Sequence, residues 1–254
     1  MKAAVFHAAN QPITIEEVAV NKPGPREVLL RTAFAGLCHS DLHYLEGLYP
    51  IATPVVLGHE SSAIVEAVGD GVTYVKPGDH VITCLSVFCG TCPQCLTGHP
   101  NLCENTEVKM LPGVARRMTW NGQQLNQAFN LSSFAEQMLV HENAMVKIDP
   151  DIPLDRAALV GCGVMTGVGA VFNAAKVEPG ATVAVIGCGG VGFSSMTIRI
   201  PSRWRQRMSV PSLTSGFTGV SRTRSNISEQ ILSSSMRFCV CRLTATCPSF
   251  GTLR

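Results

Sequence analysis

Short apolar runs rich in β-branched residues dominate the first 150 residues of this 254-residue chain. Turns that contain glycine and proline, such as 21–26 and 75–80, separate these runs. Short strands divided by frequent turns are typical of a β-barrel or a β-sandwich. The pattern therefore predicts an all-β first domain, with strands over 1–6, 13–18, 27–36, 61–69, 80–85 and 133–140.

The pattern changes beyond Asp151. Segments 151–163 and 165–176 predict helices, and Pro153 lies near the start of the first. A buried-strand run, a glycine-rich turn and a helix start follow within 179–193. We therefore expect a mixed β and α/β chain, with a boundary between two domains near residues 150–175.

Four closely spaced cysteines indicate a structural metal site. They form the pattern C-x2-C-x2-C-x7-C and are Cys89, Cys92, Cys95 and Cys103. Four thiolates close a tetrahedral zinc site. An iron–sulfur cluster is the alternative, but the ferredoxin pattern has three residues before its last cysteine and a proline after it. Here seven residues precede the last cysteine and Glu104 follows it.

A second group of candidate ligands mixes residue types. Cys38 lies in GLCHSDLH, His59 and Glu60 lie in LGHE, and Cys162, in GCG, is a possible further ligand. Three mixed protein ligands leave one coordination position open, as in catalytic zinc sites. Both patterns together predict a metalloenzyme with one zinc of each kind.

Gly187, Gly189 and Gly192 fit G-x-G-x-x-G after a predicted strand. Such glycines permit a tight turn and a close approach of the backbone to a pyrophosphate, which the next helix N-terminus attracts. A dinucleotide is therefore expected here; a glycine-rich turn without a ligand is the alternative.

Composition places the chain in a reducing compartment. Eleven cysteines in a chain with this tight spacing favour metal binding over disulfides, which predicts a cytoplasmic location. We expect no membrane partner, because no apolar run has the length of a membrane span and the N-terminus lacks the apolar region of a signal peptide.

These motifs together resemble the zinc-dependent medium-chain alcohol dehydrogenases. The likeness covers about residues 1–195 and rests on GLCHSD, LGHE, KPGD, the four-cysteine lobe, GCG and VIGCGGVG, in that order. Segment 117–140 is similar to the class I and class III branch, bacterial members included. The resemblance implies a GroES-like β-barrel catalytic domain over 1–160, the start of a Rossmann NAD-binding domain over 161–198 and an irregular tail over 199–254.

The resemblance also implies roles for individual residues. Cys38, His59 and Cys162 would bind the catalytic zinc, with Glu60 as an alternate ligand. Asp41 would orient His59, because metal-bound imidazoles usually need such a partner. The remaining residues would relay the alcohol proton (Ser40, His43) or contact the cofactor (His39, Thr166, Gly187, Gly189, Gly190, Val191, Gly192).

The resemblance to this family implies hydride transfer between an alcohol or aldehyde and NAD. It also implies two zinc ions per chain. Family members are often homodimers. Class III members oxidise the glutathione adduct of formaldehyde and carry an arginine where this chain has Glu107. Apolar residues 48–54 replace acidic residues of that class, and Ser40 replaces a threonine. These departures weaken the glutathione prediction and leave a general alcohol, or a different thiol adduct, open.

The likeness ends abruptly after Ser195. The acid that binds the adenosine ribose lies about 20 residues past the glycines, yet residues 205–212 contain no acid, and Pro201 would interrupt the helix. Residues 199–254 have nine arginines and one acid, a net charge of +8, against −6 for residues 1–198.

We interpret the tail as out-of-frame translation or an unrelated fusion, and the chain as an inactive fragment that binds NAD poorly. The alternative is a zinc-binding module whose basic tail binds nucleic acid or a protein; we expect no nucleic-acid partner.

Overall fold

The computed structural model describes residues 1–105, 108, 117–178, 183, 185, 187, 189–196 and 240–241. These residues fall in two compact units. The first unit is Met1–Cys162, and the short strand β12 (Val240–Cys241) belongs to it; the second unit begins at Gly163. No helix in the described part of the chain is long and apolar enough to cross a membrane.

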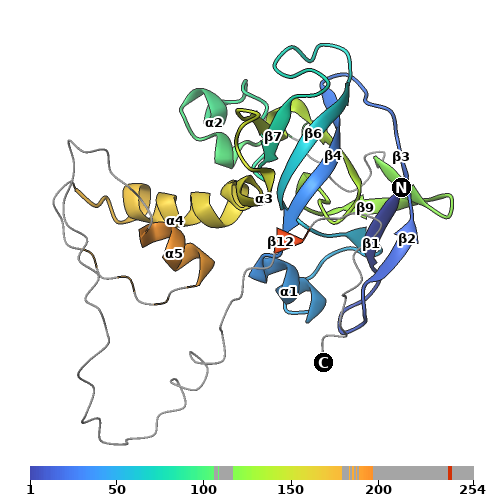
Figure 1. Cartoon of the computed structure of the whole chain (residues 1–254), viewed down its shortest axis with the longest axis horizontal. Helices are drawn as coiled ribbons and strands as arrows, with labels where there is room; N and C mark the ends of the chain where they lie inside the picture. The colour runs from blue at the N-terminus through green and yellow to red at the C-terminus, as the bar shows by residue number, and fades with distance from the viewer. Residues whose placement is uncertain are drawn as a thin grey trace, which may run out of the picture. The chain divides into compact units, whose positions relative to one another are not determined.

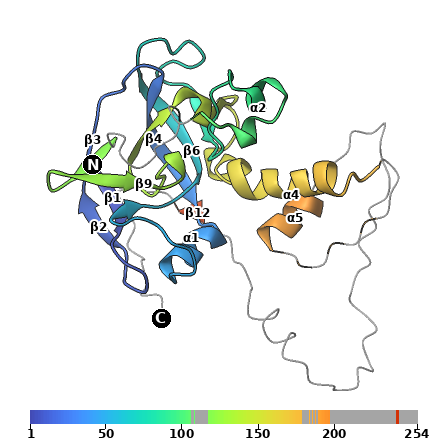
Figure 2. The same cartoon turned by 180° about the vertical axis from the view of Figure 1, so that it is seen from behind.

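Two sheets build the first unit, as Figures 1 and 2 show from opposite sides. The strand order of one sheet is β2-β1-β5-β9-β8-β3. Its only parallel pair among the described strands is β5 with β9, so a chain segment crosses over between these two. The strands are β1 (Lys2–Phe6), β2 (Thr14–Glu17), β3 (Ala19–Val20), β5 (Val55–Val56), β8 (Met118–Trp120) and β9 (Gln123–Gln127).

The other sheet has the order β10-β4-β6-β7-β11, with β12 also paired to β4. Its long central pair is antiparallel and contains two register shifts, which bend the strands. The pairing ends with Gly36 opposite Glu60, so it brings a glycine beside a candidate metal ligand. The strands are β4 (Glu27–Gly36), β6 (Glu60–Val68), β7 (His80–Thr83), β10 (Gln137–His141) and β11 (Met145–Lys147).

Alternation along the strands creates the core. In β4, Val28 and Leu30 are fully buried, while Arg31 is exposed, as a period of two requires. Each such buried aliphatic side chain stabilises the fold by about 1.5–3 kcal/mol. One apolar cluster joins β4, β6, β7 and β10 and extends to Cys89 and Cys103, so the cysteine lobe is attached to the core.

The helices of the first unit are short and lie in the connections. Helix α1 begins after Cys38, and α3 begins after Pro153, where the sequence predicts a helix start. The helical segments are α1 (His39–Leu45), α2 (Pro93–Leu96), η1 (Pro100–Leu102), η2 (Ala128–Asn130), η3 (Glu142–Ala144) and α3 (Leu154–Ala157).

The second unit is helical in its described part. A π-helical turn, η4 (Val160–Val164), leads into α4 (Met165–Gly169) and η5 (Ala170–Ala174). Helix α5 (Gly190–Met196) begins at the predicted helix start and packs on α4, where a Cβ at Gly167 would lie 2.5 Å from the Val191 carbonyl oxygen. The predicted strand over 181–186 and the predictions for residues 199–254, β12 apart, lie largely outside the described residues.

All six strands predicted in the first 150 residues are confirmed, although β10 begins later than expected. The unpredicted strands lack the signal that sequence patterns offer. Strand β5 has two residues, and β9 reads QQLNQ, whose glutamines are not β-formers.

Candidate metal centres

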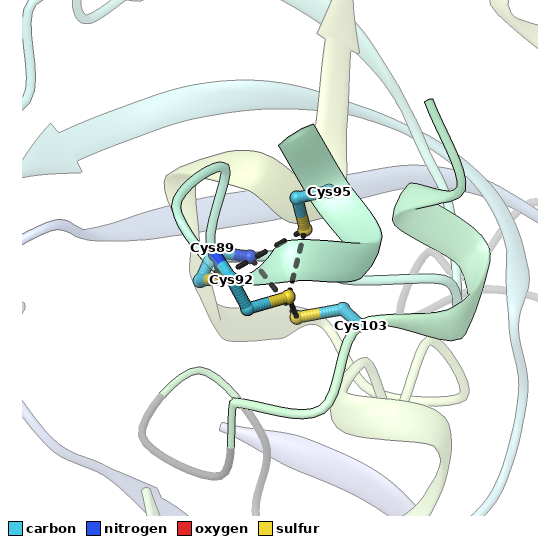
Figure 3. A group of neighbouring side chains, drawn as sticks. All are labelled: Cys89, Cys92, Cys95 and Cys103. Carbon is cyan, nitrogen blue, oxygen red and sulfur yellow. Dashed lines mark hydrogen bonds between the residues drawn. The ribbon is translucent and has the colours of Figure 1, made fainter. Parts of the chain in front are cut away.

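The four lobe cysteines converge on one point. Figure 3 shows their side chains turned toward one another from the loop around α2 and from the segment after η1. The ligand atoms all lie within 4.8 Å of one another. Neighbouring sulfurs are separated by 3.5 Å (Cys92 to Cys95) and 3.9 Å (Cys89 to Cys95, and Cys92 to Cys103).

Backbone amides surround the lobe sulfurs. The amide groups of Thr91 and Cys92 donate to the Cys89 sulfur at 3.3 Å, and the Cys89 amide donates to the Cys103 sulfur at 3.3 Å. The Thr91 hydroxyl and these amides lower the pKa of Cys89 to about 5, whereas burial raises the pKa of Cys95 to about 11. The loop thus stabilises negative charge on at least one sulfur through backbone amides and a hydroxyl.

The spacing of the lobe sulfurs suits a single zinc ion. Four sulfurs at about 2.3 Å from a tetrahedral centre are about 3.8 Å apart, close to the separations of 3.5–3.9 Å in the lobe. An iron–sulfur cluster distributes four thiolates over two or four irons, so some of its cysteine sulfurs would lie farther apart than the 4.8 Å within which all four lie here. The lobe can therefore hold one mononuclear metal ion.

A second cluster brings together Cys38, His59, Glu60 and Cys162, whose ligand atoms also lie within 4.8 Å of one another. Distant parts of the chain supply these residues: the cap of α1, the start of β6 and the π-helical turn η4. The cluster therefore exists only when the barrel and the segment after α3 are folded together.

A glycine determines where Cys162 lies. A Cβ at Gly161 would be 2.0 Å from the carbonyl oxygen of Thr83, the last residue of β7. Only glycine allows the backbone to pass this close to β7. The GCG sequence thus holds Cys162 beside ligands that are more than 100 positions earlier in the chain.

Asp41 links three parts of the cluster through one buried carboxylate. It accepts hydrogen bonds from the amides of Cys38 and Gly58, both at 3.2 Å, and its Oδ1 lies 3.4 Å from Nδ1 of His59. The side chains of Asp41 and His59 are 4% and 2% exposed. This contact leaves the other imidazole nitrogen for the cluster, since a carboxylate favours a proton on the nitrogen it faces.

The side chains of the cluster by themselves favour a thiolate and an imidazolium side by side. A hydrogen bond from the Cys162 thiol, with others from His59 and Ser40, lowers the pKa of Cys38 to about 3. The same bond raises the pKa of Cys162 above its ordinary range. Burial opposes charge on His59, but Asp41 and Cys38 outweigh it and raise its pKa to about 10. A metal ion would take the place of these protons, because metal ligands must be deprotonated.

Glu60 is a buried carboxyl group with spare coordination capacity. It is 1% exposed, and burial together with the Cys38 charge raises its pKa to about 7. The neighbouring Cys162 thiol partly opposes this rise in the pKa of Glu60. The Oε2 atom of Glu60 has no hydrogen-bond partner within the described part of the protein. A buried polar atom of this kind is costly unless something binds it.

Phe129 belongs to this site, although no sequence motif singles it out. Its ring centroid lies 4.5 Å from that of His59 and 5.6 Å from that of Tyr44. Its φ of 56° lies in the left-handed region, which is a genuine outlier for a bulky residue. Left-handed Asn130 and Ser132 follow it. No periodicity or motif in the sequence signals such a turn.

The predicted relay residues lie on α1, next to the cluster. The Ser40 hydroxyl is 3.6 Å from the Cys38 sulfur. The ring of His43 contacts those of His39 and Tyr49, at 4.6 and 5.0 Å. Their roles stay predictions.

The glycine turn belongs to the second unit, with Thr166 and Val191. Gly187 has a φ of +96°, and a Cβ at Gly192 would lie 2.0 Å from the Gly187 carbonyl oxygen. Both positions therefore require glycine, as a tight turn before a helix does. Their cofactor role stays a prediction.

Residues 24–150, half of the chain, match the family model of the alcohol dehydrogenase GroES-like domain. The chain belongs to the zinc-dependent medium-chain alcohol dehydrogenase family. The membership confirms the predicted GroES-like barrel and the resemblance drawn from the motifs.

Relatives within this alcohol dehydrogenase family include enzymes from plants and bacteria. Class-3 alcohol dehydrogenase of Pisum sativum is 44% identical over 199 residues, which are 76% of this chain and 53% of the relative. S-(hydroxymethyl)glutathione dehydrogenase of Haemophilus influenzae is 43% identical over 198 residues, 76% of this chain and 52% of the relative. The chain spans about half the length of the curated relatives it matches.

Solved structures show the same relationship. An alcohol dehydrogenase zinc-binding domain protein from Burkholderia ambifaria is 37% identical with a TM-score of 0.71, over 76% of this chain and 54% of that one. Benzyl alcohol dehydrogenase from Acinetobacter calcoaceticus is 36% identical with a TM-score of 0.68, over 76% of this chain and 53% of that one.

Proposed function

We propose that the cluster of Cys38, His59, Glu60 and Cys162 is the catalytic zinc centre of an alcohol or aldehyde oxidoreductase. The observation that carries this proposal is a mixed sulfur, nitrogen and oxygen donor set within 4.8 Å, inside a family of alcohol dehydrogenases. With Cys38, His59 and Cys162 as the three ligands, zinc would keep one position for a substrate oxygen.

The residues fit a zinc ion. Two thiolates and an imidazole are ligands that zinc prefers. The charge of a nearby cation would also stabilise the buried Glu60 carboxylate, whose Oε2 has no hydrogen-bond partner among the described residues. When bound, zinc would act as a Lewis acid on an alcohol or carbonyl oxygen. Cys38, His59 and Cys162 would hold it, and Asp41 would keep the His59 ring in its orientation.

The residues of α1 are suited to proton transfer. Ser40 lies beside Cys38, and His43 is one turn further along the same helix, so the two can carry a proton from the substrate hydroxyl toward solvent. The Phe129 ring lies beside His59, and the Tyr44 ring packs on Phe129 in turn, so this side of the imidazole is covered by an aromatic side chain. Glu60 would serve as an alternate ligand when the substrate position changes occupant.

The cysteine lobe would hold the second zinc, in a structural role. Four thiolates satisfy zinc fully and leave no position for a substrate. The lobe contributes Cys89 and Cys103 to the core, so zinc there would stabilise the region around α2 rather than take part in the reaction.

NAD would accept the hydride, in keeping with the glycine turn over 187–192. The backbone approach that Gly187 and Gly192 allow suits a pyrophosphate. Residues 205–212 offer no carboxylate for the ribose hydroxyls. We therefore expect this chain to bind NADH more weakly than the low micromolar dissociation constants that correspond to about −8 kcal/mol. Titration calorimetry measures this directly.

Two classes of substrate can be distinguished by experiment. An alcohol or aldehyde is the general expectation, and the thiol adduct of formaldehyde is the alternative suggested by the name of the Haemophilus influenzae relative. Glu107, whose structure lies outside the described residues, opposes the carboxylates of glutathione by its charge. We favour the simple alcohol for this reason.

Cobalt(II) in place of zinc tests the proposal without NAD. Ethanol, benzaldehyde or S-(hydroxymethyl)glutathione should change the visible cobalt spectrum of the chain if the site binds that substrate. Cys38→Ser should abolish the change, and His99→Ala, in the lobe loop, should preserve it. A cobalt-loaded chain that responds to none of the three would contradict the proposal; a response to the adduct alone would reverse the substrate choice.

We further propose that the sequence from about residue 196 arises from a shifted reading frame. The support is the loss of lysine and of alternating apolar residues inside a predicted helix, whereas natural domain boundaries fall in exposed linkers. Reading the coding DNA one nucleotide over should restore an Ala- and Gly-rich helix and then a β-branched strand ending in Asp or Glu. Only stop codons in the other frames would refute this.

A further inference from the structure

Gly36 faces the carboxylate of Glu60 across the β4–β6 pair. The two residues are register partners at the end of the pairing. A Cβ built on Gly36 would lie 2.6 Å from Oε2 of Glu60 and 3.2 Å from its Cβ. The missing side chain of Gly36 therefore provides the space in which this carboxylate oxygen lies.

The oxygen in that space is the one without a partner. Oε2 of Glu60 makes no hydrogen bond within the described residues, although Glu60 is 1% exposed. Leu159 forms another wall, since its Cδ2 would be 2.9 Å from the Gly36 Cβ. The space is thus lined by a glycine and a leucine, and neither offers a hydrogen bond that would hold the carboxylate there.

We infer that Gly36 is a positioning residue that lets Glu60 withdraw from the metal and so keeps the fourth coordination position open. This inference rests on the proposed function. With a methyl group in the space, the nearest relief is for the flexible carboxylate to turn toward the cluster, whose other ligand atoms lie within 4.8 Å. Glu60 would then be a permanent fourth ligand, and a closed four-ligand site is of the structural kind.

The backbone at Gly36 does not itself require glycine. Its φ lies outside the left-handed region, and the residue is part of a regular strand. Alanine therefore fits the local conformation. Gly58 is different, since it has a φ of +93°. The effect of Gly36→Ala should accordingly come from the space beside Glu60 rather than from strand geometry.

The experiment uses the whole chain loaded with cobalt(II), and imidazole as the external ligand. Wild type should change its visible spectrum as imidazole occupies the open position. Gly36→Ala should bind the metal but need at least about tenfold more imidazole for the same change, because Glu60 competes for the position. It should also release the metal to a chelator about tenfold more slowly. A factor of ten corresponds to roughly 1.4 kcal/mol.

Removal of the carboxylate supplies the decisive control. In a Glu60→Ala background, Gly36→Ala should have no further effect on imidazole binding or metal release. An effect that persists there would act through Leu159 or the strand and would overturn the inference. So would a Gly36→Ala protein that binds imidazole as wild type does.

A second variant approaches the same space from its other wall. Leu159→Phe fills it without changing β4, and should close the site in the same way; this keeps the inference testable if Gly36→Ala folds poorly. Leu159→Phe with unaltered imidazole binding would overturn it. If the wild-type chain binds only one metal ion, in contrast, the proposed function is contradicted, and the inference about Gly36 fails with it.

Discussion

The cysteine lobe and the mixed cluster both gather four ligands within 4.8 Å, but the chain builds them differently. The lobe takes all its ligands from residues 89–103, and backbone amides surround the sulfurs. The mixed cluster joins residues 38 and 162, and a buried side-chain carboxylate positions its imidazole. A local site of identical ligands suits a permanent ion, whereas a site assembled by the whole barrel can keep one position free.

Loss of one lobe cysteine should break this comparison most completely. Cys103→Ser should remove one zinc per chain and loosen residues 84–105, while the zinc at Cys38 and His59 remains, because no ligand is shared. Elemental analysis and hydrogen exchange check both effects. Cys84→Ser is the matched control, since Cys84 shortly precedes Cys89 in the chain but belongs to neither cluster. An unchanged zinc content in Cys103→Ser would be inconsistent with the structural site.

The different construction also explains how far the sequence could be interpreted. Local spacing made the lobe predictable, and short apolar runs made six strands predictable. The mixed cluster needed the family resemblance, because nothing in the spacing connects Cys162 with Cys38. Phe129 could not be predicted at all, since its role depends on a left-handed turn and on contacts across the fold. Strands such as β9 form through their neighbours rather than their own residues.

The carboxylate that supports His59 should matter for one site only. Asp41→Asn keeps the shape but removes the charge, and residues of this kind contribute about 10–100-fold to metal affinity. We expect a loss of that size at the mixed cluster and no change at the lobe. Competition with a chromophoric chelator resolves the two affinities. Equal weakening of both sites would mean that Asp41 acts by stabilising the fold.

The lobe should tolerate the matching change in its surroundings. Thr91→Val removes the hydroxyl that donates to the Cys89 sulfur at 3.5 Å but keeps the amide donors. Lobe zinc affinity should fall by less than about threefold, because the two amide donors at 3.3 Å continue to stabilise charge on the Cys89 sulfur and a hydrogen bond as long as 3.5 Å contributes only about 0.5 kcal/mol. The same chelator competition measures it. A loss as large as that of Asp41→Asn would remove the distinction between backbone and side-chain support.

One chain should hold two metal ions in sites of different kinds, one with all four positions filled by protein ligands and one with a position open. Titration of metal-free wild type with cobalt(II), followed by imidazole, tests it most directly. The chain should bind two equivalents, and imidazole should alter the visible bands of one equivalent only. A single equivalent, two equivalents that both respond, or absorption typical of an iron–sulfur cluster would contradict the account.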